Sequence, residues 1–189
     1  MINIQFRRRR EKRTDYNSRL SLLRSGKTRL VVRKTLKHCL AQLVDYTPQG
    51  DKVVAAASSL ELNKFGWTLP TGNLPAAYLT GFLCGLKAKG KVKDAILDIG
   101  LHDSTKGGTV YAVLKGVVDA GIQVPHDTGI LPSMERISGK HIADYAEALK
   151  KSDQAEFKKR FASYLKSNAK PEETPKKFEE AKNAIKAKF

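Results

Sequence analysis

Short stretches of β-branched and apolar residues at 30–32, 38–46 and 52–58 are the feature that most constrains the fold of this chain. Each stretch has the length of a strand, and turn-forming segments separate them: a Lys-rich segment first, then Pro48 to Asp51. Connections this short join antiparallel neighbours, because parallel strands need a crossover of about a dozen residues or more. The pattern therefore predicts three antiparallel strands in a meander.

A helix is predicted directly after the meander. Asn73 is placed to cap it, Pro75 lies in its first turn, and Gly90 marks its end. Gly81 and Gly85 lie within it, and small residues at such spacing let a backbone approach a neighbouring element closely. We expect that neighbour to be the sheet.

A further strand and a second helix follow. Residues 94–99 predict a strand in which Ile96 and Leu97 are buried, and apolar residues recur at helical spacing from about residue 109 to 121. A helix between a meander and another strand implies a crossover connection. The predicted class is α/β, with a mixed sheet made of an antiparallel meander plus a crossover strand, and with helices packed on it.

Helical segments are also expected near the C-terminal end. Residues 137–149 form one such segment, Asp153 and Glu156 form a capping pair for the next, and Thr174 with Pro175 opens the last. The apolar stripes are Phe157, Phe161, Tyr164 and Leu165 in the second segment, and Phe178, Ala181 and Ile185 in the third. These stripes predict packing on or beside the core.

The charge is concentrated at the two ends of the chain, whose formal net charge is +16. Residues 1–37 hold thirteen Lys or Arg against two acids, residues 38–138 hold nine of each, and residues 139–189 hold thirteen against eight. A block of like charge repels itself unless a polyanion neutralises it, so nucleic acid is the first partner to suspect. The chain thus divides into a basic arm (1–28), an α/β core (29–138) and a basic helical extension (139–189).

The arm, in which we expect one or two helical turns, is rich in arginine rather than lysine. Arg7 to Arg10 stand together, and Lys12 and Arg13 follow. A guanidinium binds phosphate through two hydrogen bonds and stacks on bases, which suits structured RNA. Phe6 and Tyr16 add aromatic surface on which an unpaired base can stack. We therefore interpret the arm as an RNA-binding segment whose affinity falls steeply with salt.

A Gly-rich loop before the second core helix is another candidate contact. The backbone N–H groups of Gly107 and Gly108 could hold a phosphate at the helix N-terminus, and Lys106 adds charge. The same residues fit an ordinary turn in which Asp103 caps the helix. The spacing does not decide between the two.

Two functions other than binding structured RNA remain open from the residues alone. Asp94, Asp98 and Asp103 lie near one strand and could hold magnesium in a nuclease that works through Asp98 and Asp103. A general nucleic-acid-packaging protein would need only the charge. The first alternative predicts RNA cleavage, and the second predicts no preference for structured RNA over duplex DNA.

Weaker signals are assigned to ordinary structural roles. The Gly-Lys-Thr segment at 26–28 lacks the earlier Gly that a phosphate loop needs. His102 and His126, each followed by Asp, have no further His at ligand spacing, so no metal site, cofactor or catalytic residue is predicted. Cys39 and Cys84 are too few for a disulfide scaffold or a four-Cys zinc site, which favours a reducing compartment.

Targeting signals are also missing from the pattern. No apolar region follows the N-terminal charge, so a secretory signal is not expected. The longest apolar run, residues 74–86, is shorter than the roughly twenty residues that span a bilayer. We expect a cytoplasmic protein with no membrane partner.

Residues 1 to about 150 resemble a known family. The Arg-rich start and many later residues together resemble the large-subunit ribosomal proteins that bind 5S ribosomal RNA, universal protein eighteen, in their archaeal and eukaryotic form. The long eukaryotic extension is absent, so the archaeal form is the nearer one. The residues that carry the resemblance are Thr14, Asp15, Tyr16 and Arg19; residues 28–33; Ala55, Ala56, Ser58, Leu60, Gly66 and Trp67; Asn73, Pro75, Ala76, Tyr78 and Gly81; and Asp98, Gly100, Lys106, Gly107, Gly108, Val110, Leu114, Lys115, Gly116, Asp119, Gly121, Pro125 and His126.

The resemblance implies a structural, non-enzymatic role in the large ribosomal subunit and a ribonuclease-H-like core without nuclease function. The protein would clamp 5S ribosomal RNA in the central protuberance, fasten it to the large-subunit ribosomal RNA beside neighbouring ribosomal proteins, and bind no DNA. The RNA contacts that it implies are Arg7, Arg8, Arg9, Arg10, Lys12, Arg13, Tyr16 and Arg19 in the arm; Arg24, Lys27, Arg29 and Arg33 on adjoining surfaces; and Lys106, Gly107, Gly108 and Lys115 as further contacts.

Overall fold

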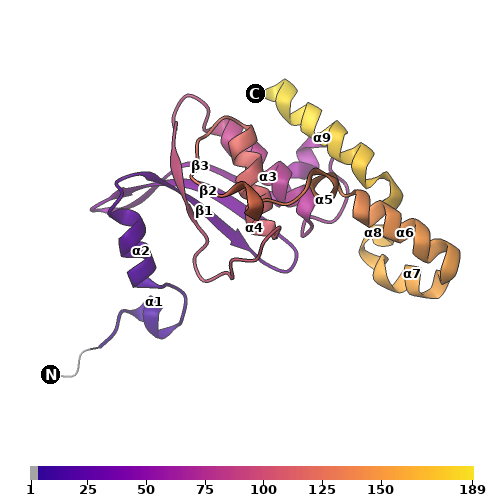
Figure 1. Ribbon diagram of the computed structural model, residues 1–189, viewed down its shortest axis with the longest axis horizontal. Coiled ribbons are helices and arrows are strands. Elements are labelled where there is room, and N and C mark those ends of the chain that lie inside the picture. The colour runs from indigo at the N-terminus through magenta and orange to yellow at the C-terminus, as the bar shows by residue number, and fades with distance from the viewer. Residues whose placement is uncertain (1–3) are drawn as a thin grey trace.

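A four-stranded mixed sheet lies at the centre of the molecule, for which a computed structural model describes residues 4–189 (Figure 1). The strands are β1 (Thr28–Lys34), β2 (Cys39–Thr47), β3 (Gly50–Ser58) and β4 (Ala95–Asp98). The first three form an antiparallel meander, β4 pairs in parallel with β1, and the order is β3-β2-β1-β4. The α/β class and the crossover strand are confirmed. The β2–β3 turn is shorter than predicted, because Gly50 and Asp51 already pair within β3.

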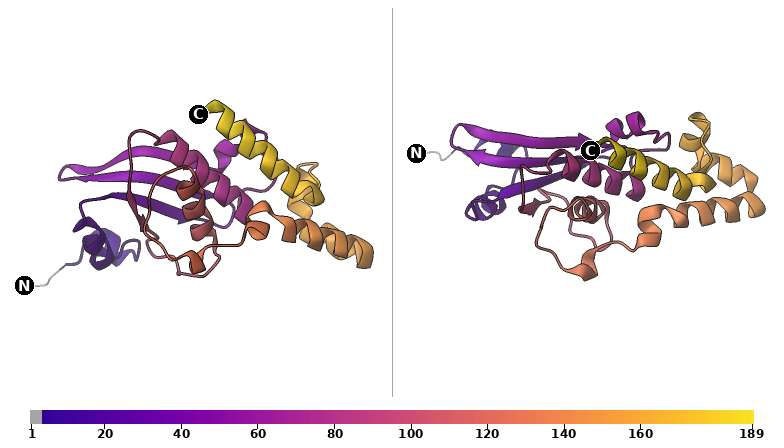
Figure 2. Two further views of the ribbon diagram at one scale, coloured as in Figure 1. Left: turned by 45° about the horizontal axis from the view of Figure 1, so that its top comes forward. Right: turned by 90° about the horizontal axis from the view of Figure 1, so that it is seen from above.

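Two helices cover one face of the sheet (Figure 2). In α3 (Leu74–Lys87), the side-chain oxygen of the predicted cap Asn73 accepts the N–H of Ala76 at 3.0 Å. α4 (Thr109–Asp119) follows β4. The core lies between the sheet and these helices, where Leu30, Val32 and Leu83 are completely buried.

β4 departs from the prediction in which of its residues are buried. Ala95 and Asp98 are buried, whereas Ile96 and Leu97, both expected in the core, are half-buried. β4 is an edge strand of the sheet. On its open side, an isolated bridge joins Asp94 to Gln123, in the segment after α4. Its side chains are therefore less covered than those of the inner strands.

The small residues of α3 serve a different neighbour from the one predicted. A Cβ added to Gly81 would overlap the backbone carbonyl of Val113 in α4, and one added to Gly85 would lie 2.5 Å from the Cβ of Ala120. From the α4 side, a Cβ on Gly116 would overlap the carbonyl of Tyr78. The close approach is therefore between α3 and α4, and the expected approach to the sheet is wrong.

Shorter elements complete the chain on both sides of the core. The arm carries short helices, as predicted, and the extension consists of helices joined by short non-helical segments. The bounds are α1 (Arg7–Arg10), α2 (Tyr16–Leu23), the 3-10 segments η1 (Ser59–Phe65), η2 (Thr128–Ile130) and η3 (Pro171–Glu173), and the helices α5 (Met134–Ser138), α6 (Lys140–Ser152), α7 (Gln154–Arg160), α8 (Ala162–Lys166) and α9 (Thr174–Lys188).

The extension contains two helix breaks that the sequence did not predict. The segment expected at 137–149 is divided into α5 and α6 by Gly139, whose φ of +82° is left-handed and favours glycine. The next expected helix is divided at Phe161 into α7 and α8. The break lets the ring of Phe161 meet that of Tyr164 at 5.5 Å between centroids, and it leaves Leu165 43% exposed rather than on the apolar stripe.

α9 joins the extension to the core. Its apolar stripe of Phe178, Ala181 and Ile185 is completely buried, as predicted. The ring of Phe178 lies 5.5 Å from that of Tyr78 in α3, centroid to centroid. The extension thus packs on the helix layer, at the end of the molecule opposite the arm (Figure 1).

The close packing of α3 on α4 predicts that Gly81→Ala destabilises the fold. The added methyl group meets backbone atoms that cannot move aside, and overpacking of this kind costs about 1–3 kcal/mol. Denaturant unfolding followed by circular dichroism measures the change. Gly129→Ala is the matched control, since its Cβ would make only ordinary contacts, and an equal effect of the two changes would contradict the prediction.

Candidate nucleic-acid interface

A buried arginine on β1 organises the region where the arm meets the sheet. The side chain of Arg29 is 2% exposed. One terminal nitrogen donates to Asp98 Oδ2 at 2.9 Å, and the other donates to Asp51 Oδ2 at 2.7 Å. Strand alternation explains the position, because Leu30 and Val32 face the helices and Arg29 therefore faces the other way. The guanidinium of Arg29 is buried, and each of its two terminal nitrogens donates to a carboxylate.

Two more arginines extend this arrangement. Arg19 of α2 donates to both carboxylate oxygens of Asp51, at 2.9 and 3.0 Å. Arg33 of β1 donates to Asp98 Oδ1 at 3.0 Å and to the Asp98 carbonyl at 2.9 Å. We call Arg19, Asp51, Arg29, Asp98 and Arg33 the arginine–aspartate network. The pair between Arg19 and Asp51 connects α2 of the arm to β3 of the sheet.

The network corrects the expectation for Arg29, which the resemblance placed among the surface RNA contacts. The side chain is 2% exposed and its two terminal nitrogens donate to two carboxylates, so Arg29 does not lie on the surface where the resemblance placed it. The sequence pattern gave no role to Asp51, and it indicated Asp98 only as a magnesium ligand of the nuclease alternative. Their partners lie 22 and 69 residues away in the chain, a separation that no local pattern reveals.

The arm itself leaves most of its cations facing water. α1 has no buried residue, and the four arginines along it are exposed. Arg8 donates to the Thr14 hydroxyl at 2.9 Å, and Glu11 lies 3.6 Å from Arg7 and 3.5 Å from Arg13. Exposed pairs at such distances hold little energy, so these guanidinium groups remain available to a stronger anion.

Asp15 shapes the arm rather than neutralising it. Its Oδ1 accepts the backbone N–H of Asn17 at 2.9 Å and caps α2. The hydroxyl of Ser18 donates to Oδ2 at 2.6 Å, and this bond, followed by the backbone bonds, lowers the pKa of Asp15. Tyr16 follows the cap, and its ring lies 5.1 Å from that of Phe6. The two aromatic residues that the sequence paired with the charge are therefore together.

The remaining predicted contacts differ in how free they are. Arg24 is exposed, but Lys27 pairs with Asp94 at 2.8 Å and Lys115 with Asp119 at 2.9 Å. Each of these lysines would have to exchange a carboxylate for a phosphate. They therefore offer less to RNA than the arginines of α1.

The Gly-rich loop does not form the phosphate cradle that its sequence suggested. The N–H of Gly107 donates to the Ile130 carbonyl at 2.9 Å, and that of Gly108 donates to the Thr105 carbonyl at 3.0 Å. Both donors are thus used within the chain. The alternative reading also needs correction, because Gly108 rather than Asp103 occupies the cap position of α4, with no side-chain hydrogen bond. Lys106 is exposed and keeps its charge at the surface.

The hydrogen bonds to Asp98 argue against the nuclease alternative. Arg29, Arg33 and the N–H of Gly100 occupy its carboxylate, which leaves little for a magnesium ion. Among residues 4–189 no three His, Cys, Asp or Glu side chains come together as a metal site, and no helix is long and apolar enough to cross a bilayer. Cys39 and Cys84 are both buried, and burial raises the pKa of each thiol to about 12.

The network predicts a stability contribution that depends on pH. Burial tends to raise the pKa of Asp51, but the hydrogen bonds from Arg29 and Arg19 outweigh it and hold the pKa below its ordinary value. A lowered folded-state pKa stabilises the protein above the unfolded pKa of about 3.9, and the stabilisation is lost as the pH falls through the folded value. Asp51→Asn should therefore cost about 1–3 kcal/mol at pH 7.

Urea unfolding of both proteins between pH 3 and 7 measures this effect. The difference between wild type and Asp51→Asn should shrink below about pH 4. Asp144→Asn is the control, because Asp144 is exposed and forms no ion pair with any residue in 4–189. A gap that stays constant with pH would rule out the ion pair as its source.

Comparison with known proteins identifies the family of the chain. The model of a family described as "Ribosomal large subunit proteins 60S L5, and 50S L18" matches residues 2–95 and 86–127. The large ribosomal subunit protein uL18 of Caldivirga maquilingensis is 52% identical over 188 residues, which cover 98% of this chain and 91% of the relative. Such proteins are structural components of the ribosome and not enzymes. On the extent of both matches, the chain belongs to the uL18 (L5e/L18) family of large-ribosomal-subunit proteins.

Proposed function

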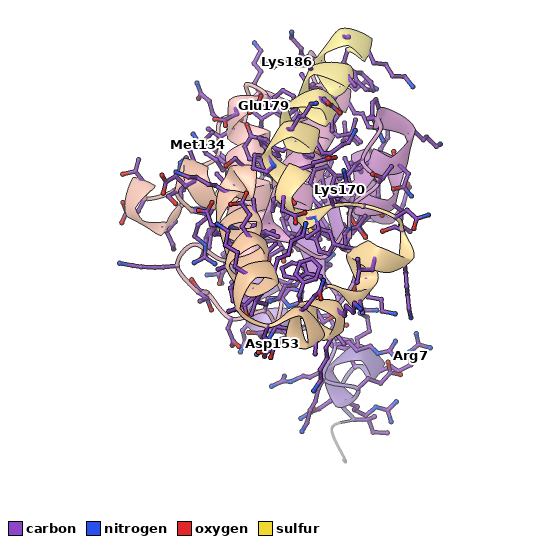
Figure 3. All side chains as sticks on the ribbon, turned by 90° about the vertical axis from the view of Figure 1, so that its right-hand side faces the viewer. Arg7, Met134, Asp153, Lys170, Glu179 and Lys186 are labelled. Atoms are coloured by element: carbon purple, nitrogen blue, oxygen red, sulfur yellow. The ribbon has the colours of Figure 1, made fainter. Side chains whose placement is uncertain are left out.

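We propose that the chain binds 5S ribosomal RNA through its arm and helps to anchor that RNA to the large-subunit ribosomal RNA in the central protuberance. The observation that carries this proposal is the set of exposed arginines on α1, held beside the sheet by the pair between Arg19 and Asp51. A cationic arm fixed to a folded core can follow a phosphate backbone and keep its register. Figure 3 shows Arg7 on α1, well separated from Lys186 on α9.

The proposed RNA contacts follow from which cations the fold leaves accessible. Arg19, Arg33, Lys27 and Lys115 already pair with carboxylates and contribute second, whereas Arg29 is excluded because it is buried. Contacts of Gly107 and Gly108 would come from van der Waals approach rather than from their N–H groups. The primary contacts are Arg7, Arg8, Arg9, Arg10, Lys12, Arg13, Tyr16, Arg24 and Lys106.

The extension is proposed to face the large-subunit RNA and neighbouring proteins of the central protuberance. The extension lies on the side of the core away from the arm, and α9 runs back toward the middle of the molecule (Figure 1). Its lysines are therefore placed to contact a second RNA segment while the arm binds the first. The division into a basic arm (1–28), a core (29–138) and an extension (139–189) describes this arrangement. The strand order, with β4 parallel to β1, fits a ribonuclease-H-like core that serves as a scaffold.

Replacing Arg7 to Arg10 by Ala should weaken 5S RNA binding and flatten its dependence on salt. Each lost phosphate contact removes roughly one unit from the slope of log K against log salt. The melting temperature should stay nearly unchanged, because α1 contains no buried residue. Filter binding or fluorescence anisotropy between 50 and 200 mM salt, with tRNA and duplex DNA as competitors, measures both quantities.

A variant with equal charge loss elsewhere provides the control. Lys151, Lys158, Lys159 and Lys166 are exposed lysines of the extension that form no ion pair with any residue in the described range 4–189. Their replacement by Ala should leave affinity for isolated 5S RNA close to that of wild type. Equal losses in the two variants, or equal competition by duplex DNA, would contradict a specific role of the arm.

A further inference from the structure

A hollow of about 850 Å³ lies between the arm and the end of β4. Tyr16 and Leu22 of α2 contribute to one wall, and Leu97, Ile99 and Leu101 contribute to the other. We call this hollow the arm–β4 groove. Its volume falls within the range of sites that hold small organic groups.

The groove is lined by more arginines than aspartates. Four arginines line it: Arg8, Arg13, Arg19 and Arg33. Arg19 and Arg33 belong to the arginine–aspartate network, whereas Arg8 and Arg13 have only the weak exposed contacts described above. The carboxylates that line it are already engaged: Asp15 caps α2, and Asp51 and Asp98 belong to the arginine–aspartate network. The groove therefore presents free guanidinium groups and no free acid.

Part of the wall of the groove is apolar. Leu101 is 56% exposed, and Leu97 and Ile99 are half-buried, so a strip of aliphatic surface faces the hollow. On the arm side, the ring of Tyr16 is supported by Phe6 at 5.1 Å. An aliphatic strip and an aromatic ring with guanidinium groups beside them match a nucleotide, whose base is flat and apolar on its faces and whose phosphate is anionic.

We propose that the arm–β4 groove receives one unpaired nucleotide of the bound RNA, with its base between Tyr16 and the aliphatic strip and its phosphate on Arg8 or Arg13. The inference rests on the proposed function, which supplies the RNA. The pair between Arg19 and Asp51 fixes the arm against the sheet, so the groove exists before the RNA arrives. A preformed site avoids the entropy of ordering the arm on binding.

The test separates apolar contact from charge. Leu101→Ser removes aliphatic surface without changing any charge, and Tyr16→Ala removes the ring at the first position of a helix that tolerates Ala. Each should weaken 5S RNA binding about 5-fold or more while leaving the salt slope as in wild type, because stacking releases no counterions. Leu60→Ser is the matched control, since Leu60 is 52% exposed on η1 and does not line the groove.

Ultraviolet cross-linking of the wild-type complex, followed by mass spectrometry, locates the nucleotide directly. An adduct on Tyr16 or on residues 97–101 supports the proposal. Affinities of Leu101→Ser and Tyr16→Ala equal to that of the Leu60 variant, with adducts only outside the groove, would overturn it. If the Arg7 to Arg10 variant still loses affinity and salt slope in that case, the arm binds RNA and only the groove assignment fails.

Discussion

The buried guanidinium of Arg29 is the constraint around which the charged side of the molecule is arranged. A cation at 2% exposure on a central strand is expensive unless carboxylates meet it, and Asp51 and Asp98 do so from β3 and β4. Removing either partner leaves charge uncompensated, so strand register and charge pairing reinforce each other. The same two carboxylates then hold Arg19 and Arg33, which gives the arm a fixed position relative to the sheet.

The two faces of β1 have different roles, one in the apolar core and one in the charged network. Leu30 and Val32 pack into the apolar layer beneath α3 and α4, and the charged residues of β1 are not part of that layer. Arg29 and Arg33, which alternate with them, form the base on which the arm rests. One strand therefore supports the hydrophobic core on one face and the candidate RNA interface on the other, as strand alternation allows.

Local patterns predicted most of the elements because most of them are locally determined. The Asn73 cap, the apolar stripe of α9 and the strands of the meander all depend on residues within a few positions of each other. The helix break at Gly139 comes from its left-handed backbone, which apolar periodicity does not register. At the other break, Phe161 packs against Phe157 and Tyr164, and periodicity did not reveal this break either.

The site was predicted less completely, because several of its contacts join residues that are far apart in the chain. Density of arginine identified the arm, since charge clustering is visible in the sequence. Burial of Arg29 depends on carboxylates 22 and 69 residues away, and only the folded register brings them together. The wall of the groove formed by Leu97 to Leu101 likewise becomes part of the interface only because the arm lies beside it.

In the folded protein, most of the positive charge of the arm stays without a carboxylate partner. The arm has two acids, and the cap of α2 uses Asp15, so Glu11 alone is left to face Arg7 and Arg13. The nearest acids of the core, Asp51 and Asp98, are occupied by the network. Glu11 alone cannot neutralise the four arginines of α1. Because like charges held on one short helix repel each other, a bound polyanion would stabilise the folded arm. The network that secures the arm thus also keeps the core carboxylates Asp51 and Asp98 away from the arginines of α1.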